Sequence, residues 1–191
     1  MNTTRHYSAH FVGKLLVAMP HIKVPPFSQT LIYICGHNEQ GSMGIIVNRL
    51  EPKIQFEDLL LHVGLMTKHA PKGVPIYCGG TTGIDRGFVL HSTDCLVKES
   101  ILVGENLALT GTIGILEAIA SGCAPQNYWV VMGHTRWPAG RLEHDVQENE
   151  WLCIEPNAEL IFSTDVETKW RQAFAVLDIV PARLTAFYGH A

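Results

Sequence analysis

The sequence predicts a single α+β domain built on a mixed or antiparallel sheet. Short apolar runs often follow one another along the chain without a helix between them, whereas a parallel α/β fold alternates strands with helices. The 191 residues include 47% hydrophobic residues and carry a net charge of −4, which together suit one globular domain with its own core. No linker or repeat divides the chain, so we expect one domain over residues 1–191, with residues 1–10 as a flexible N-terminus.

The first part of the chain predicts three strands and a helix. Each strand is a short run rich in apolar, β-branched or aromatic residues, and the helix has apolar side chains three or four positions apart. The polar segment 37–41 predicts a hairpin turn, Pro25-Pro26 a loop, and Gly64 the end of the helix. The expected strands are 15–18, 29–35 and 44–47, and the expected helix is 55–63.

The rest of the chain predicts further short strands and three helices. Thr112 is placed to cap the first of these helices, and Thr164 with Glu167 forms a capping box for the last. The residues between Gly133 and Gly140 are expected to form a loop. The expected strands are 74–78, 87–91, 100–103, 107–109, 128–132, 151–154 and 159–162. The expected helices are 113–120, 141–150 and 165–177, the last burying Trp170, Phe174 and Leu177.

Several functional classes are disfavoured by the absence of their motifs. The chain has no G-x-G-x-x-G, G-x-x-x-x-G-K-[ST], H-E-x-x-H, C-x-x-C or G-x-S-x-G pattern, so we expect no cofactor and no metal ion. No apolar run approaches the length of a membrane span, and no secretory signal is visible, so a cytoplasmic location is expected. The five cysteines are scattered and odd in number, which favours reduced thiols over a disulfide framework.

The charge balance argues against direct nucleic-acid binding. The chain has 14 Lys and Arg residues against 18 Asp and Glu residues, and the basic residues are dispersed. Binding to phosphate backbones requires clustered Lys and Arg side chains. We therefore expect a protein or small-molecule partner and no membrane, and the sequence is compatible with a homo-oligomer.

Four residues in the middle of the chain are candidates for ligand binding. Asn48 and Arg49 close the expected strand 44–47, where an arginine can hold a carboxylate or phosphate through two hydrogen bonds or can pair with a structural carboxylate. Arg86 offers a second cation, and His91 ends an apolar strand, either as an acid–base group or as a satisfied core histidine. The nearby Gly79-Gly80 allows a tight turn or a close approach to a ligand.

The richest segment runs from Gly133 to Glu143. It combines glycines, a proline, Trp137, basic residues and the acceptor Glu143. Loops placed by a rigid scaffold often carry binding residues, so Trp137 and Glu143 join the candidate ligand-binding set. The alternative is that Trp137 is a structural anchor that fixes a surface loop.

Several segments, taken together in this order and spacing, resemble the YqgE/AlgH family of bacterial proteins, over about residues 13–191. They read GKLLVAMP from Gly13, HNEQGSMGIIVNR from His37, GG at Gly79, RGFVLH from Arg86, GHTRWPAGRLE from Gly133, ENEWL from Glu148 and the terminal GHA. The chain departs from the family pattern at Leu50, Thr81-Thr82, His134-Thr135-Arg136 and Arg141, where the family usually has Pro, Pro-Val, Tyr-Ala-Gly and Gln.

The resemblance implies a single α+β domain whose strongly bent sheet closes into a pseudo-barrel with helices packed outside. It implies no reaction and no catalytic residues, since the family is biochemically uncharacterised. One member is linked to control of alginate synthesis, and that link gives the family its label of transcriptional regulator. No DNA-reading helix pair is evident in this chain.

Two functions follow from these observations. The first is a non-enzymatic regulatory or interaction protein. The second is a small-molecule binder or enzyme that acts on an anionic ligand, in a cleft lined by Arg49, His91 and the segment from Gly133 to Glu143.

Overall fold

The computed structural model describes residues 11–65, 70–162, 165–181 and 184. The expected flexible segment 1–10 and the terminal GHA lie outside these residues. The strands are β1 (Leu15–Ala18), β2 (Leu31–Asn38), β3 (Gly41–Ile46), β4 (Ile76–Cys78), β5 (Thr82–Ser92), β6 (Ile101–Leu102), β7 (Leu107–Thr110), β8 (Tyr128–Pro138) and β9 (Trp151–Ile154). The helices are α1 (Phe56–His62), α2 (Ile113–Ala120), α3 (Arg141–Gln147), α4 (Ala158–Phe162) and α5 (Lys169–Ala175).

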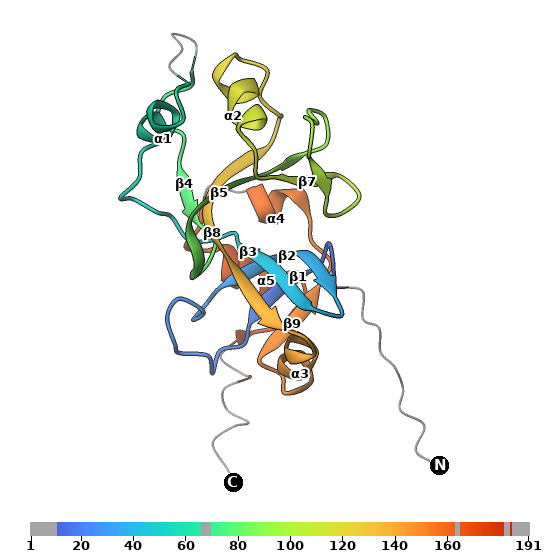
Figure 1. The fold of residues 1–191 in the computed structure, drawn as a ribbon. Coiled ribbons are helices and arrows are strands. Elements are labelled where there is room, and N and C mark those ends of the chain that lie inside the picture. Colours follow the sequence, from blue (N-terminus) through green and yellow to red (C-terminus); the bar gives the residue numbers. More distant parts are fainter. Residues whose placement is uncertain (1–10, 66–69, 163–164, 182–183, 185–191) are drawn as a thin grey trace.

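The strands form one curled sheet in the order β6-β7-β5-β8-β3-β2-β1-β9, with β4 paired to β8 beside this path. Strands β4 and β8 run parallel, and the other pairs are antiparallel. The sheet bends into a half-barrel, with α4 between its two halves (Figure 1). The α+β class and the bent, mostly antiparallel sheet are therefore confirmed.

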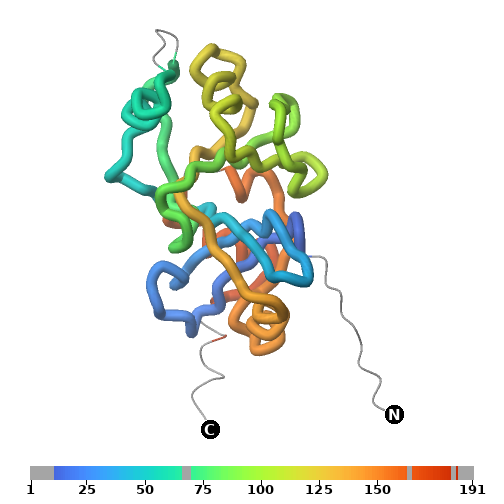
Figure 2. Tube along the Cα trace, in the orientation of Figure 1, coloured from blue at the N-terminus to red at the C-terminus, as the bar shows by residue number. Residues whose placement is uncertain are grey.

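Strand β8 joins the two halves of the sheet. Its first part pairs with β4 and β5, and its last part pairs with β3, from Thr135 to Pro138. The trace in Figure 2 shows β8 passing from the upper half of the molecule into the lower half. The loop predicted from Gly133 to Gly140 is wrong over residues 133–138. Gly133 adopts a φ of 73°, so the strand bends there and continues.

The segment predicted as strand 159–162 is also wrong, because it belongs to helix α4. The side-chain oxygen of Asn157 accepts a hydrogen bond of 2.6 Å from the backbone N–H of Leu160, which caps the first turn. Helix α5 begins at Lys169, and Thr164 of the predicted capping box lies outside the described residues. Trp170 and Phe174 are buried as predicted, whereas Leu177 lies beyond the helix and is exposed.

Most of the remaining elements agree closely with the sequence, but three bounds differ most: β5 begins at Thr82 where the prediction began at 87, β3 begins at Gly41 where it began at 44, and α3 ends at Gln147 where it ended at 150. Strands β1 and β9 have the predicted bounds, and Thr112 is the N-cap residue of α2, although its hydroxyl makes no capping hydrogen bond. The predicted hairpin joins β2 to β3, with Asn38 opposite Gly41. Strand β2 starts two residues later than predicted, since Gln29 adopts a φ of 53°.

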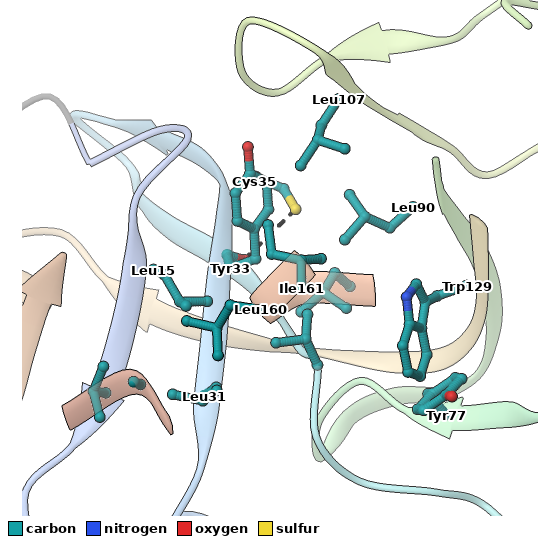
Figure 3. Close-up of a cluster of buried hydrophobic side chains, with 14 of the residues drawn as sticks. Leu15, Leu31, Tyr33, Cys35, Tyr77, Leu90, Leu107, Trp129, Leu160 and Ile161 are labelled. Carbon is teal, nitrogen blue, oxygen red and sulfur yellow. Dashed lines mark hydrogen bonds between the residues drawn. The ribbon is translucent and has the colours of Figure 1, made fainter. Parts of the chain in front are cut away.

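The core follows from the alternation of side chains along the strands. On the inner face of the half-barrel, residues from both halves of the sheet pack around α4 and α5. Figure 3 shows Ile161 of α4 between Tyr33 of β2 and Leu90 of β5. On the outer face, one cluster packs the lower half against α3, and another packs the upper half against α1 and α2.

Candidate functional site

Asn48 and Arg49 hold a loop against the sheet. The side chain of Asn48 accepts a hydrogen bond of 2.9 Å from the backbone N–H of Leu31, and its amide donates to a second backbone group. Arg49 donates from Nε to the carbonyl of Pro26 at 3.2 Å and from Nη2 to the carbonyl of Ser28 at 2.5 Å. The polar groups of this pair are thus directed at the chain's own backbone, in the segment before β2.

His91 is fully buried within the sheet. Its Nδ1 donates to the carbonyl of Ser92 at 2.9 Å, which leaves Nε2 to accept from the hydroxyl of Thr110 at 2.8 Å. Burial lowers the pKa of His91, and the carbonyl of Ser92 and the charge of Asp94 oppose this only in part. The neutral tautomer satisfies both ring nitrogens, so the structure places His91 as a core histidine.

The Gly79-Gly80 pair allows two segments of backbone to approach closely. A side-chain Cβ at Gly80 would lie 2.2 Å from the carbonyl carbon of His134, and one at Gly79 would lie 2.4 Å from the carbonyl oxygen of Gly133. The Gly79 carbonyl also accepts a hydrogen bond of 2.9 Å from the N–H of Ile46. These glycines therefore join β3 to β8 and leave no room for a ligand between them.

Arg86 lies on β5, near His134 of β8. Its guanidinium is 5.7 Å from the ring centre of Phe88, and His134 contacts the same ring edge-on. Burial lowers the pKa of His134, with smaller contributions from Arg136 and Arg86. Among the described residues, the buried Nδ1 of His134 has no hydrogen-bond partner. The imidazole is thus kept neutral beside two exposed cations.

Trp137 and Glu143 lie on β8 and α3. The indole of Trp137 is 7% exposed and meets Trp151 edge-on, with ring centres 6.2 Å apart. Glu143 lies 3.6 Å from Nε2 of His37, measured from its Oε1. Trp137 is buried in strand β8 and does not fix a surface loop as one of the two sequence interpretations held, and its surroundings form the wall of a groove.

A groove of about 480 Å³ lies between the loop before β2 and the end of β8 with helix α3. We call it the Trp137 groove. The aromatic rings of Phe27, Trp137 and Trp151 meet edge-on along it. Its charged and titratable lining residues are His21, Lys23, Arg136, Arg141, Asp145 and Glu150.

The charges of the Trp137 groove are not all neutralised internally. Arg141 pairs with Asp145 at 2.6 Å, from Nε to Oδ1. Lys23 and Arg136 are exposed, and within the described part of the chain neither has a carboxylate within ion-pair distance. Glu150 also lines the groove and has no cation within ion-pair distance among the described residues. The groove therefore offers two available cations and one carboxylate beside the edges of aromatic rings, which suits an anionic ligand with a flat apolar part that approaches from the side of Lys23 and Arg136.

A second pocket, of about 430 Å³, opens at the mouth of the half-barrel. Lys14 and Glu155 form an ion pair at its rim, so the cation there is already neutralised. The hydroxyl of Tyr33 donates to the carbonyl of Val103 at 2.6 Å. Lys14 and Glu155 are thus engaged with each other, and the Tyr33 hydroxyl is engaged with the backbone. This second pocket is therefore the weaker candidate.

Lys169 is a buried cation that sequence reasoning missed. Its side chain is fully buried, and Nζ donates to the carbonyls of Val47 at 2.9 Å and of Ile161 at 2.5 Å. Nζ also lies 4.1 Å from the ring centre of Trp129. Burial lowers the pKa of Lys169 to about 7, against a smaller opposing effect of Asp165. The only signal in the sequence is helical spacing, which puts Lys169 on the buried face of α5.

The described residues hold neither a metal-binding group of side chains nor a membrane-spanning helix. No three His, Cys, Asp or Glu side chains are grouped so that they could hold a metal ion. Over the same residues, every helix is too short or too polar to cross a bilayer.

Comparisons with known proteins give a consistent result. A family model described as AlgH-like matches residues 15–182. A UPF0301 protein of Rhodopseudomonas palustris (strain HaA2) is 39% identical over 188 residues, covering 94% of this chain and 86% of the relative. A UPF0301 protein of Vibrio parahaemolyticus is 37% identical over 196 residues and covers 100% of both chains.

Two solved structures share the fold. The solution structure of the AlgH protein from Pseudomonas aeruginosa matches with a TM-score of 0.75 and 32% identity over 100% of both chains. A crystal structure of a Corynebacterium diphtheriae protein matches with a TM-score of 0.72 over 90% of each chain, but at 14% identity it shows the fold alone.

Proposed function

This chain belongs to the AlgH-like family, and from its groove we propose that it is a non-enzymatic regulatory or interaction protein that recognises an anionic group. The single observation that supports this proposal is the Trp137 groove, in which Lys23 and Arg136 stand beside buried aromatic rings without a carboxylate partner in the described chain. The regulatory part of the proposal rests on the family name.

The charge of the whole chain makes these two cations more significant. A protein with a net charge of −4 repels anions at long range, so local recognition has to come from placed cations. Arg136 projects outward from β8, between the buried side chains of Thr135 and Trp137. A guanidinium on a rigid strand can hold a carboxylate or phosphate through two hydrogen bonds without losing much side-chain freedom.

The chemistry that fits the groove is a carboxylate or phosphate attached to a flat apolar group. A free aromatic anion would supply both parts, and so would an acidic residue beside an aromatic residue in a protein partner. The volume of about 480 Å³ lies within the range of small-ligand sites. Because His91 and His134 are neutral and packed inside the fold, the proposal includes no proton-transfer step.

Nuclear magnetic resonance titration tests the proposal with two kinds of probe. One arm uses benzoate and phenyl phosphate, and the other uses a short peptide containing Asp, Glu and Trp. Arg136→Glu reverses the charge of the groove, and Arg171→Glu, an exposed arginine on α5, is the matched control.

We expect shifts of resonances from the groove, weaker binding at higher salt, and at least about tenfold weaker binding in Arg136→Glu with Arg171→Glu unchanged. Binding of the free anions only would assign a small ligand, and binding of the peptide only would assign a protein partner. If neither probe shifts groove resonances, or if the two variants behave alike, the proposal is wrong.

A further inference from the structure

Two cysteines far apart in the sequence meet at one edge of the upper half of the molecule. Cys95 follows strand β5, and Cys123 follows helix α2. The Sγ of Cys95 lies 3.3 Å from the backbone carbonyl oxygen of Cys123. Cys123 is exposed and Cys95 is half-buried, and both are free thiols in the structure.

The backbone of Cys123 is fixed by the end of α2. Gly122 adopts a φ of 84°, and its N–H donates to the carbonyl of Ile119 at 3.2 Å. The N–H of Cys123 donates to the carbonyl of Ala118 at 2.8 Å. These two hydrogen bonds form a Schellman motif, which holds the residue after a helix in one position.

The turn that carries Cys95 is fixed against the same segment. The N–H of Ser92 donates to the carbonyl of Asn127 at 2.9 Å. A carboxylate oxygen of Asp94 accepts a hydrogen bond of 2.9 Å from the N–H of Gln126. Both cysteines are therefore held by short hydrogen bonds on either side of the contact, which gives the two thiols a high effective concentration.

We infer that Cys95 and Cys123 are the site of an intramolecular disulfide that forms when the protein meets a small-molecule disulfide such as oxidised glutathione. Because the Sγ of Cys95 lies 3.3 Å from the backbone of Cys123, we expect rotation about the two Cα–Cβ bonds to bring the sulfur atoms together. The bond would tie the end of α2 to the end of β5. This inference is independent of the Trp137 groove.

The chemistry proceeds through two thiol–disulfide exchanges. The exposed Cys123 thiolate attacks one sulfur of oxidised glutathione, which forms a mixed disulfide and releases one glutathione thiolate. The Cys95 thiolate then attacks the Sγ of Cys123, closes the protein disulfide and releases the second glutathione thiolate. Two protein thiols lose two electrons and two protons, and one glutathione disulfide is reduced to two thiols.

Tryptic mapping can identify the bond without ambiguity. Cleavage after Arg86, Lys98 and Arg136 places Cys95 in peptide 87–98 and Cys123 in peptide 99–136, each with a single cysteine. The full-length protein is equilibrated with mixtures of oxidised and reduced glutathione, quenched with acid, alkylated in denaturant with excess iodoacetamide at about pH 8, where thiols react as thiolates, and digested without reductant. We expect the cross-linked pair of peptides, which separates on reduction, and a melting temperature higher by roughly 5 °C in the oxidised protein.

Single substitutions separate this pair from general thiol oxidation. In the Cys95→Ser variant, Cys123 should keep one glutathione as a mixed disulfide. In the Cys123→Ser variant, Cys95 should carry far less glutathione. Cys78→Ser, which removes another half-buried thiol, should cross-link like the unmodified sequence. The inference is overturned if wild-type Cys123 carries only glutathione or stays unmodified in fully oxidised buffer, or if peptide 99–136 pairs with any cysteine other than Cys95.

Discussion

Lys169 gives the protein a pH dependence of stability that one substitution can isolate. Lys169→Met removes the ammonium group and keeps an unbranched side chain of similar length. In the folded protein, burial lowers the pKa of Lys169 from 10.5 to about 7. Between these values the unfolded chain binds a proton that the folded protein has released. Wild-type stability should therefore rise with pH in this window, and the contribution of Lys169 should be lowest below pH 7.

The size of the effect follows from the two pKa values. Each unit of pKa difference corresponds to about 1.4 kcal/mol. Raising the pH from about 6 to about 9 takes the folded protein through its pKa while the unfolded chain stays protonated, so wild type should gain about 2.5 kcal/mol relative to Lys169→Met. The carbonyls of Val47 and Ile161 stabilise the ammonium group, which makes this value an upper bound.

Urea unfolding of both proteins at half-unit steps of pH measures this difference. Burial raises the pKa of Cys35, Tyr33 and Tyr77, but these groups contribute equally to both proteins and cancel in the difference. Lys98→Met, at an exposed position, is the matched control, and its difference from wild type in unfolding free energy should not change with pH. A flat difference for Lys169→Met would refute the argument, because it would mean that the buried amine keeps its ordinary pKa.

Three other substitutions test the structural roles assigned to the candidate residues. Gly80→Ala should lower the free energy of unfolding by about 3 kcal/mol or more because its Cβ would overlap the backbone of His134, whereas Gly64→Ala, with open space around it, should cost about 1 kcal/mol in the same chemical denaturation assay. Asn48→Ala should lose about 2 kcal/mol of unfolding free energy, since it leaves a buried backbone N–H unpaired. Wild type should lose stability relative to His91→Gln as the pH falls below about 6.5, because burial lowers the pKa of His91 in the folded state. Urea unfolding midpoints of the two proteins across this range measure the loss, and a difference that stays constant with pH would contradict the prediction.

Strand β8 shows what local sequence patterns can and cannot predict. The apolar run 128–132 predicts the first half of the strand correctly, because a buried strand needs only a short run of β-forming residues. The second half is polar and begins at a glycine, so it has the composition of a loop. In the structure Gly133 provides a bend, and pairing with β3 supplies the hydrogen bonds that extend the strand. Pairing between distant segments is not visible in a local pattern, and this accounts for the error.

Helix α4 is a different kind of error, because its signal was present in the sequence. Asn157 precedes Ala158, Glu159 and Leu160, which is an N-cap residue followed by three strong helix formers. The apolar run that follows also suits a strand, and an interpretation based on hydrophobicity alone favoured the strand. In the structure Asn157 does cap the helix, accepting from the N–H of Leu160, which agrees with this local signal.

The candidate ligand residues show why a list of reactive side chains does not identify a site. Arg49 and His91 both have suitable chemistry, yet their polar atoms are directed at groups of the fold itself. The groove arises instead where chain segments distant in sequence converge on β8. Along that strand Trp137 is buried and Arg136 is exposed, and both residues line the groove, so an aromatic anchor and an available cation lie at one site. The composition of the segment between Gly133 and Glu143 pointed to the right part of the chain, but only the strand geometry shows which of its side chains a ligand could reach.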